Sequence, residues 1–317
     1  MSEIVNFEKE KLQKLEKEAI PDPFQDLDFR ELELSLYRPR TFLSILLSWV
    51  VAAMTLLALI PLFAVLWMLL WRGGKKLSLA LFTQLPPAPL EQGGGFGNAI
   101  LGTLVMVGIA TLITVPLGVL TGVYLAQAKE GKFASAVRFA AKILTGFPSI
   151  LAGVFAYGAI VLITGGFSAV AGGIALSILM LPTIILTSEN AIAMVPAKMK
   201  EAAIGLGATT TQTTLMVLLP TAMPAILTGI MLAVARAAGE TAPLLFTALF
   251  SNYWLMSHGR LNLMQPTASL AVLIYNFSAM PFANQRELAW AAAFVLVLLV
   301  LVTNLIGKSF SSQQMER

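Results

Sequence analysis

An arginine and a glutamate one helical turn apart are the most unusual pair of charged side chains in this sequence. Arg236 and Glu240 lie within a long apolar run, residues 222–249, and a helix would place them on one face. Arg236 lies about 14 residues into that run, which is about 21 Å along a helix axis. An arginine at such a depth costs about 2.5–3.5 kcal/mol on insertion scales. We therefore expect the pair to face a partner helix or an aqueous path.

Two chemical roles are open to this pair. In the first, Arg236 and Glu240 only neutralise each other as a structural ion pair. In the second, the guanidinium lines a path and attracts an anion, because its planar fork of donors matches the oxygens of phosphate or carboxylate. Glu240 would then hold the guanidinium in place. A carboxylate so close repels an anion, which suits transient passage better than storage.

Other patterns that support catalysis or metal binding are incomplete. Gly307-Lys308-Ser309 resembles the end of a phosphate-binding loop, but that motif requires glycine where Val302 stands. The chain has no cysteine and a single histidine, His258, which we expect to be solvated. A His-x-x-x-His zinc pair is therefore impossible, and the apolar runs hold no pair of deep carboxylates. We expect a protein with no catalytic residues, no bound metal and no cofactor of its own.

Composition places these residues in a membrane protein. Hydrophobic residues make up 57% of the 317 residues and charged residues 12%, whereas a soluble domain carries about 25% charge. A helix needs about 20 apolar residues to cross the hydrocarbon core. The sequence therefore predicts an all-α membrane protein with six transmembrane helices, at residues 41–71, 99–126, 140–163, 168–188, 222–249 and 288–307.

Several local features refine this picture. A seventh apolar run, 269–282, is too short to span and is expected to be amphipathic or re-entrant. Gly118 and Gly122 form a small-residue face that predicts close helix packing. Pro148 should interrupt or bend the third run.

The distribution of lysine and arginine predicts the orientation. Placing both termini in the cytoplasm puts 15 of the 21 basic residues on the inner side and 5 on the outer side, in keeping with the positive-inside rule. The basic residues between 72 and 76 run against that rule. We expect a charged cytoplasmic tail at 1–40, an external loop at 72–98 and a cytoplasmic tail at 308–317. From this composition we expect the protein to contact membrane lipid and not to bind nucleic acid.

A polar stretch of about 30 residues, 189–221, joins the fourth and fifth runs on the predicted inner side. Residues 198–204 suit a short amphipathic helix, Gly207 a turn, and Pro220 the start of the next helix. Such a helix–turn–helix elbow would act as a lever that rotates the adjoining spans as rigid bodies. An ordinary loop between spans is the alternative.

The elbow carries a recognisable pattern. Glu201-Ala202-Ala203, Gly207, Val217 and Leu219-Pro220 resemble the EAA loop of bacterial ABC-importer permeases, with Val217 where isoleucine is usual. The resemblance implies a type I ABC-importer permease (MetI-like) fold, with the permease domain at 97–307 and the coupling loop at 195–221. It also implies that a coupling helix sits in a groove of a separate ATPase subunit. The positions that it assigns to this coupling are Glu201, Ala202, Ala203, Gly207, Leu219 and Pro220.

The run from Ala235 to Thr247 narrows the resemblance. Together with Gln265-Pro266 and the start of the last run, it is similar to PstA-type permeases of bacterial phosphate-specific transport systems. That resemblance implies a multi-pass protein of the bacterial inner membrane that imports inorganic phosphate, with Arg236 and Glu240 in the substrate pathway. It further implies a PstC-type sister permease, an external PstS-type binding protein and a homodimer of PstB-type ATPase subunits, which would bind ATP with Mg.

Other functions stay open at this point. A permease for another oxyanion, such as molybdate, sulfate or phosphonate, would share the EAA loop. An intramembrane enzyme would need a nucleophile or metal cluster at depth, and a sensory or scaffold protein would need neither the arginine nor the elbow.

Overall fold

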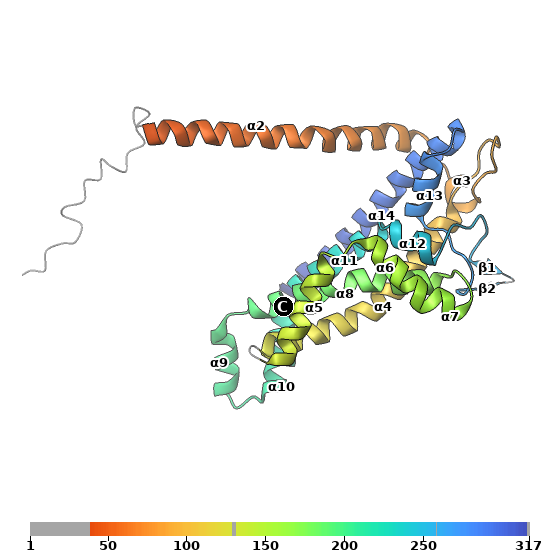
Figure 1. The fold of residues 1–317 in the computed structure, drawn as a ribbon. Coiled ribbons are helices and arrows are strands. Elements are labelled where there is room, and N and C mark those ends of the chain that lie inside the picture. Colours follow the sequence, from red (N-terminus) through yellow and green to blue (C-terminus); the bar gives the residue numbers. More distant parts are fainter. Residues whose placement is uncertain (1–38, 129–130, 258, 316–317) are drawn as a thin grey trace, which may run out of the picture. The chain divides into compact units, whose positions relative to one another are not determined.

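The computed structural model describes residues 39–128, 131–257 and 259–315 (Figure 1). The predicted tail at 1–40 lies almost entirely outside these residues, and so does His258. The chain divides into two units, Met1–Phe63 and Ala64–Arg317. Helix α2 begins in the first unit and ends in the second. The described part of the second unit is a bundle of helices with one two-stranded sheet.

The elements follow one another along the chain with these bounds: α2 Pro39–Met68, η2 Leu69–Gly73, α3 Ala80–Thr83, α4 Gly97–Gln127, α5 Lys132–Thr145, α6 Ser149–Ala156, η3 Tyr157–Val161, α7 Leu162–Thr164, α8 Ala169–Ala193, α9 Ala197–Gly205, α10 Thr210–Thr213, η4 Thr214–Leu218, α11 Leu219–Ala238, α12 Ala242–Thr247, β1 Met256–Ser257, β2 Arg260–Leu261, α13 Leu270–Ser278 and α14 Ala283–Met315.

Five helical runs of the described chain are long and apolar enough to cross a membrane. A bent pair of helices supplies a sixth span if the pair is counted as one. The predicted all-α architecture is therefore confirmed. The short seventh run is also confirmed, since α13 has only nine residues. The five long runs are Thr41–Gly73, Gly97–Gln127, Ala169–Ala193, Thr210–Ala238 and Ala283–Ser309.

The predicted span at 140–163 is a bent pair of helices in the structure. Two helical arms, Lys132–Thr145 and Ser149–Thr164, meet there at an angle of 108°. Pro148 accounts for the break, because it lacks the N–H that a helix interior needs and biases Phe147 toward extended backbone. The expected interruption at this proline is confirmed.

The predicted run at 222–249 is shifted in the structure. The continuous helix begins at Thr210, passes through the π-helical η4 and ends at Ala238. The α-helical part, α11, begins at Leu219, so Pro220 lies in its first turn, as expected, but η4 leads into that turn without a break. A proline ring clashes with the carbonyl four residues earlier, and that carbonyl lies in η4, where π-type spacing has already replaced the regular α-helical ladder.

Helices α4 and α8 pack closely at two glycines of α4. A Cβ added to Gly118 would lie 2.7 Å from Ile184 Cγ2, and one added to Gly122 would lie 2.5 Å from Ser188 Cβ. Both partners on α8 are fully buried. The main apolar core of the unit is built from α4, α8 and α11 around this contact. The packing role predicted for the small-residue face is confirmed.

Replacing Gly118 with leucine is expected to destabilise the bundle. The added side chain has no space beside Ile184, and overpacking of a filled core costs about 1–3 kcal/mol. The measurement is the thermal unfolding midpoint of the purified protein in detergent. Gly108→Leu is the matched control, because Gly108 also belongs to α4 and has open space around its Cβ position. An equal loss in both variants would contradict the packing contact.

Candidate functional site

The end of α11 positions the charged pair. Arg236 lies in the last turn of α11, and Gly239 caps that turn with its N–H donating to the Arg236 carbonyl at 3.1 Å. Glu240 follows in the short break before α12. Pro243 stands at the first turn of α12, where a missing N–H costs nothing. The sequence predicted one continuous helix through both residues. In the structure the pair lies at a helix break instead.

Helix α6 fixes the far side of this break. A Cβ added to Gly153 of α6 would lie 2.6 Å from the Cα of Pro243. Only glycine permits such a close approach of the two backbones. The arm that follows the 108° bend is thus packed directly behind the break that carries Glu240.

Arg236 and Glu240 approach each other, but loosely. Arg236 Nε lies 3.5 Å from Glu240 Oε1, a long distance for a charge-assisted bond, which is normally about 2.7–2.9 Å. The Arg236 side chain is 49% exposed and that of Glu240 only 16%. In the described chain the guanidinium makes no other hydrogen bond that would occupy its remaining donors. The Glu240 carboxylate is therefore mostly covered by the chain, whereas the Arg236 guanidinium lies exposed at its surface.

The elbow is built from α9, a glycine turn and α10. α9 covers the predicted short helix, which is confirmed. Gly207 has a φ of +85°, a left-handed conformation that favours glycine, so the predicted turn is confirmed too. Thr209 then caps α10 in a reciprocal capping box with Gln212.

The positions of the EAA pattern differ in their exposure and in their place in the fold. Glu201 and Ala202 are exposed, whereas Ala203 is buried against the rest of the chain. Next to them Ile204 and Leu206 are also exposed, the latter by 90%. Of the two later positions, Leu219 is half-buried and Pro220 exposed. The structure does not gather all six residues at one point: the first four lie on the elbow, and the last two at the start of α11.

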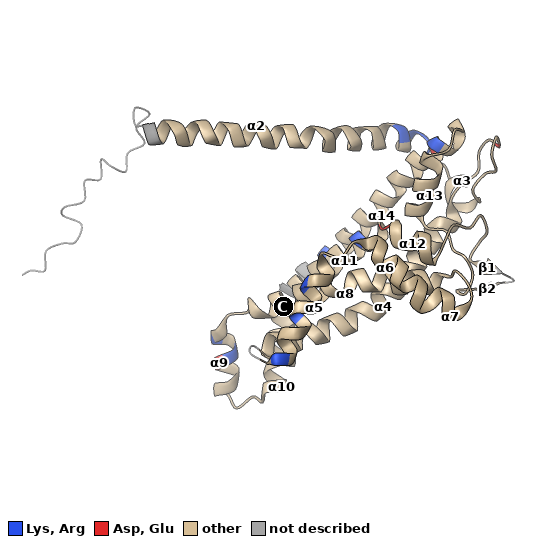
Figure 2. Ribbon diagram, viewed as in Figure 1, with Lys and Arg blue, Asp and Glu red and all other residues tan. Residues whose placement is uncertain are grey.

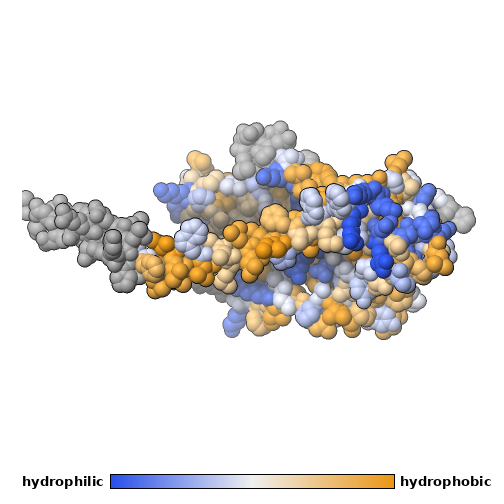
Figure 3. Space-filling view, turned by 90° about the horizontal axis from the view of Figure 1, so that it is seen from above, coloured by the Kyte–Doolittle hydropathy of each residue, from blue (hydrophilic) through white to orange (hydrophobic). Residues whose placement is uncertain are grey.

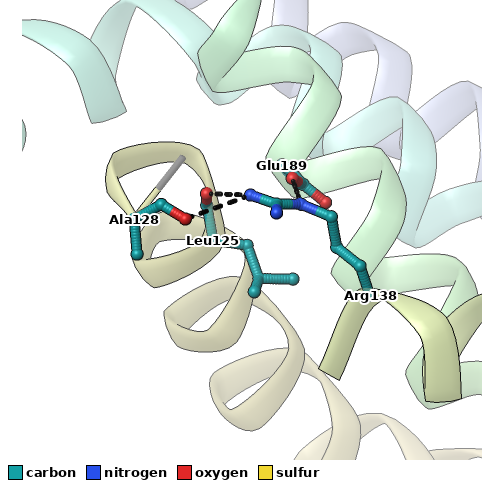
Figure 4. Close-up of polar contacts among 4 residues, drawn as sticks. All are labelled: Leu125, Ala128, Arg138 and Glu189. Atoms are coloured by element: carbon teal, nitrogen blue, oxygen red, sulfur yellow. Dashed lines mark hydrogen bonds and ion pairs between the residues drawn. The ribbon is translucent and has the colours of Figure 1, made fainter. Parts of the chain in front are cut away.

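A polar cluster that sequence reasoning missed lies at the same end of the bundle (Figure 4). Arg138 of α5 donates from Nε to the Glu189 carboxylate of α8. Its Nη2 donates to the last-turn carbonyl of Leu125 at 2.7 Å and, at 3.4 Å, to that of Ala128. One guanidinium therefore joins α5, α8 and the end of α4. The sequence offered one signal for this cluster: Glu189 is a carboxylate at the end of an apolar run, where it needs a basic partner.

A second polar contact ties this cluster to the elbow. Gln127, at the end of α4, donates from Nε2 to Thr214 Oγ1 of η4 at 2.6 Å. Helix α4 is thus bonded on one side to Arg138 and on the other to the segment that follows α10. These bonds connect η4, which follows the elbow, to α4 and, through Arg138, to α8.

Replacing Arg138 with alanine is expected to destabilise the protein by about 2–3 kcal/mol. Breaking a fully buried ion pair costs about 3–5 kcal/mol, and this pair is slightly exposed, at 22% and 14%. The thermal unfolding midpoint measures the loss. Lys142→Ala is the control, since Lys142 lies exposed on the same helix. If both variants unfold at the same temperature as the unmodified chain, Arg138 does not hold the helices together.

Known proteins resemble this chain in sequence and in fold. Residues 118–313 match the family described as binding-protein-dependent transport system inner membrane component. The phosphate transport system permease protein PstA of Haemophilus influenzae is 43% identical over 247 residues, which cover 78% of this chain and 86% of that protein. PstA of Yersinia pestis is 41% identical, covering 79% and 84%.

A solved structure supports the fold. A chain of the inward-facing MetNI methionine ABC transporter matches with a TM-score of 0.57 at 21% identity, over 68% of this chain and 94% of its own length. The predicted type I ABC-importer permease fold is confirmed. The chain therefore belongs to the family of binding-protein-dependent transport system inner membrane components and, within it, to the PstA-type permeases.

Proposed function

We propose that this chain is the membrane-spanning permease subunit of an ATP-driven importer of inorganic phosphate. The observation that carries the substrate assignment is the high similarity to two proteins named as phosphate transport permeases. The half-exposed guanidinium of Arg236 lies at a helix break in an apolar span, which agrees with an oxyanion as substrate. An importer of molybdate, sulfate or phosphonate is not favoured by these relatives.

Arg236 and Glu240 are proposed to line the substrate path. A half-exposed arginine in a lipid-facing position would be costly, so its guanidinium should face water or a partner chain. The 3.5 Å separation supports the pathway over the structural ion pair, because a tight pair would use the donors that phosphate needs. Glu240 behind it lowers the affinity for an anion by repulsion and so favours release.

The elbow is proposed to seat in an ATPase subunit. Ile204 and Leu206 are apolar and exposed on an otherwise polar segment, and an apolar surface of this kind commonly marks a protein interface. Hydrolysis of ATP with Mg would take place on a PstB-type homodimer, so that this chain has no catalysis of its own. A PstC-type permease would complete the path, a PstS-type protein would deliver phosphate from outside, and both termini would lie in the cytoplasm.

Uptake of radiolabelled phosphate tests the proposal directly. The chain is reconstituted in proteoliposomes with its proposed partner set, and ATP is supplied on the ATPase side. We expect uptake that depends on ATP, is inhibited by unlabelled phosphate and is unaffected by a tenfold excess of sulfate or molybdate. Inhibition by either of those anions that equals the inhibition by phosphate would overturn the substrate assignment.

A further inference from the structure

Four basic side chains line a cavity of about 450 Å³ between η2 and the beginning of α14. They are Arg72, Lys75, Lys76 and Arg286, and Glu287 is the carboxylate among the lining residues. Four cations and one anion give the cavity a net charge of +3. Figure 2 shows basic residues at η2, away from those near α9 and α10, and Figure 3 shows hydrophilic side chains gathered in that region. The proposed transport function assigns nothing to this cavity.

Close packing of two backbones fixes the cavity. A Cβ added to Gly73 would lie 2.6 Å from the Trp290 carbonyl oxygen of α14. The π-helical turn η2, which carries Arg72, is therefore held directly against α14. The Arg72 guanidinium carbon lies 5.7 Å from the centre of the Trp290 ring, within the range of a cation–π contact.

The positive charge in the cavity is only partly compensated. Lys76 Nζ forms an ion pair with Glu287 Oε2 at 2.6 Å. Lys75 Nζ lies 3.7 Å from the centre of the Trp71 ring, but a ring face attracts a cation without neutralising it. In the described chain the Arg286 side chain has neither an ion pair nor a hydrogen bond. Like charges so close repel one another, and a bound anion would relieve that repulsion.

The chemistry of the cavity identifies the anion. Two guanidinium groups and an ammonium group supply many donors, and arginine matches the tetrahedral oxygens of phosphate with paired hydrogen bonds. The cavity lies where the candidate span Thr41–Gly73 ends, and tryptophan beside it is typical of the headgroup layer of a membrane. Three of these basic residues, those between 72 and 76, run against the positive-inside rule in the proposed orientation, so that orientation does not explain them.

We propose that this cavity binds a phosphate group. The group would come from the headgroup of an anionic lipid or from free inorganic phosphate, and both present the same oxygens to Arg72, Lys75 and Arg286. A volume of 450 Å³ is in the range of ligand pockets, about 300–1,000 Å³. The proposal does not depend on the direction or the substrate of transport.

Binding measurements on the full chain test it. The protein is purified in detergent and stripped of lipid. Phosphatidylglycerol, diacylglycerol with the same acyl chains and inorganic phosphate are then titrated separately, with native mass spectrometry for the lipids and calorimetry for the ion. We expect phosphatidylglycerol or inorganic phosphate to bind, and diacylglycerol, which lacks the phosphate, to bind at least about tenfold more weakly. Binding of the lipid alone identifies a headgroup as the source, and binding of the ion alone identifies free phosphate.

Three variants separate a specific cavity from general surface charge. Arg72→Gln with Arg286→Gln should weaken binding about tenfold. Glu287→Gln should strengthen it several-fold, because it removes a repelling charge and releases Lys76, and a folding defect would not produce tighter binding. Arg260→Gln is the matched control, since Arg260 is an exposed arginine on β2 outside the cavity.

Three results would each overturn the proposal. The first is unchanged binding in the double variant, and the second is an equal loss in Arg260→Gln. The third is weaker binding in Glu287→Gln. Because these are binding measurements, they are independent of whether phosphate uptake is observed.

Discussion

Replacing Arg236 with leucine is expected to reduce phosphate uptake by about a hundredfold or more while assembly with the ATPase subunits persists. Leucine removes every donor that would hold the anion in an apolar span. A hydrogen bond to a charged group contributes about 1.5–3 kcal/mol, and each 1.4 kcal/mol is a factor of about ten. The substitution should leave folding intact, because the Arg236 side chain is half exposed and loosely paired.

Uptake of radiolabelled phosphate and copurification of the ATPase subunits measure the two expectations separately. Arg236→Lys is the conservative control and should retain part of the uptake, since it keeps the charge but not the planar fork. Glu240→Gln distinguishes the two roles of the pair. If the pair lines a pathway, Glu240→Gln should leave substantial uptake, whereas if the pair is only structural, both Glu240→Gln and Arg236→Leu should impair assembly. Normal uptake in a correctly assembled Arg236→Leu complex would remove Arg236 from the pathway.

The second large effect is expected at the elbow. Gly207→Val should detach or uncouple the ATPase and lower ATP-dependent uptake about tenfold. Gly207 has a φ of +85°, and no heavy atom lies within 4 Å of the place that a Cβ would take there. The damage would therefore come from the backbone and not from a clash, since a left-handed conformation costs about 1–2 kcal/mol for a residue with a side chain and is most unfavourable for a β-branched one.

Two further variants test that cause. Asparagine adopts left-handed backbone more readily than valine, so Gly207→Asn should retain most of the coupling. Gly205→Ala is the matched control, because Gly205 ends α9 with open space and without a positive φ. ATPase copurification and stimulation of ATP hydrolysis are the readouts. Unchanged coupling in Gly207→Val would show that the turn does not position α9.

The sequence predicted most of the elements because their causes are local. A long apolar run must be helical to satisfy its backbone in lipid, and five of the six predicted runs overlap a long helix. The turn at Gly207 and the break at Pro148 follow from the backbone preferences of single residues. The exact end of α11 was missed, since the apolar composition continues through Gly239 to α12 while the helix does not.

Contacts between residues far apart in the chain could not be predicted from the sequence. Arg138 and Glu189 are 51 positions apart, and nothing local indicates which carboxylate a basic residue on α5 would reach. The cavity of Arg72 and Arg286 likewise depends on η2 lying against α14. The exposure of single side chains was also unpredictable. The spacing of Arg236 and Glu240 does not indicate that the first is half exposed and the second mostly buried.

The sequence by itself determined the helical membrane architecture, the elbow with its EAA residues and the neighbouring positions of Arg236 and Glu240. Each of these depends on hydropathy or backbone preference over a few consecutive residues. Only the tertiary structure decided the 108° bend between the two arms, the Arg138 cluster and the basic cavity at η2. These depend on the angle and register at which helices pack, and side chains from distant parts of the chain set that packing together.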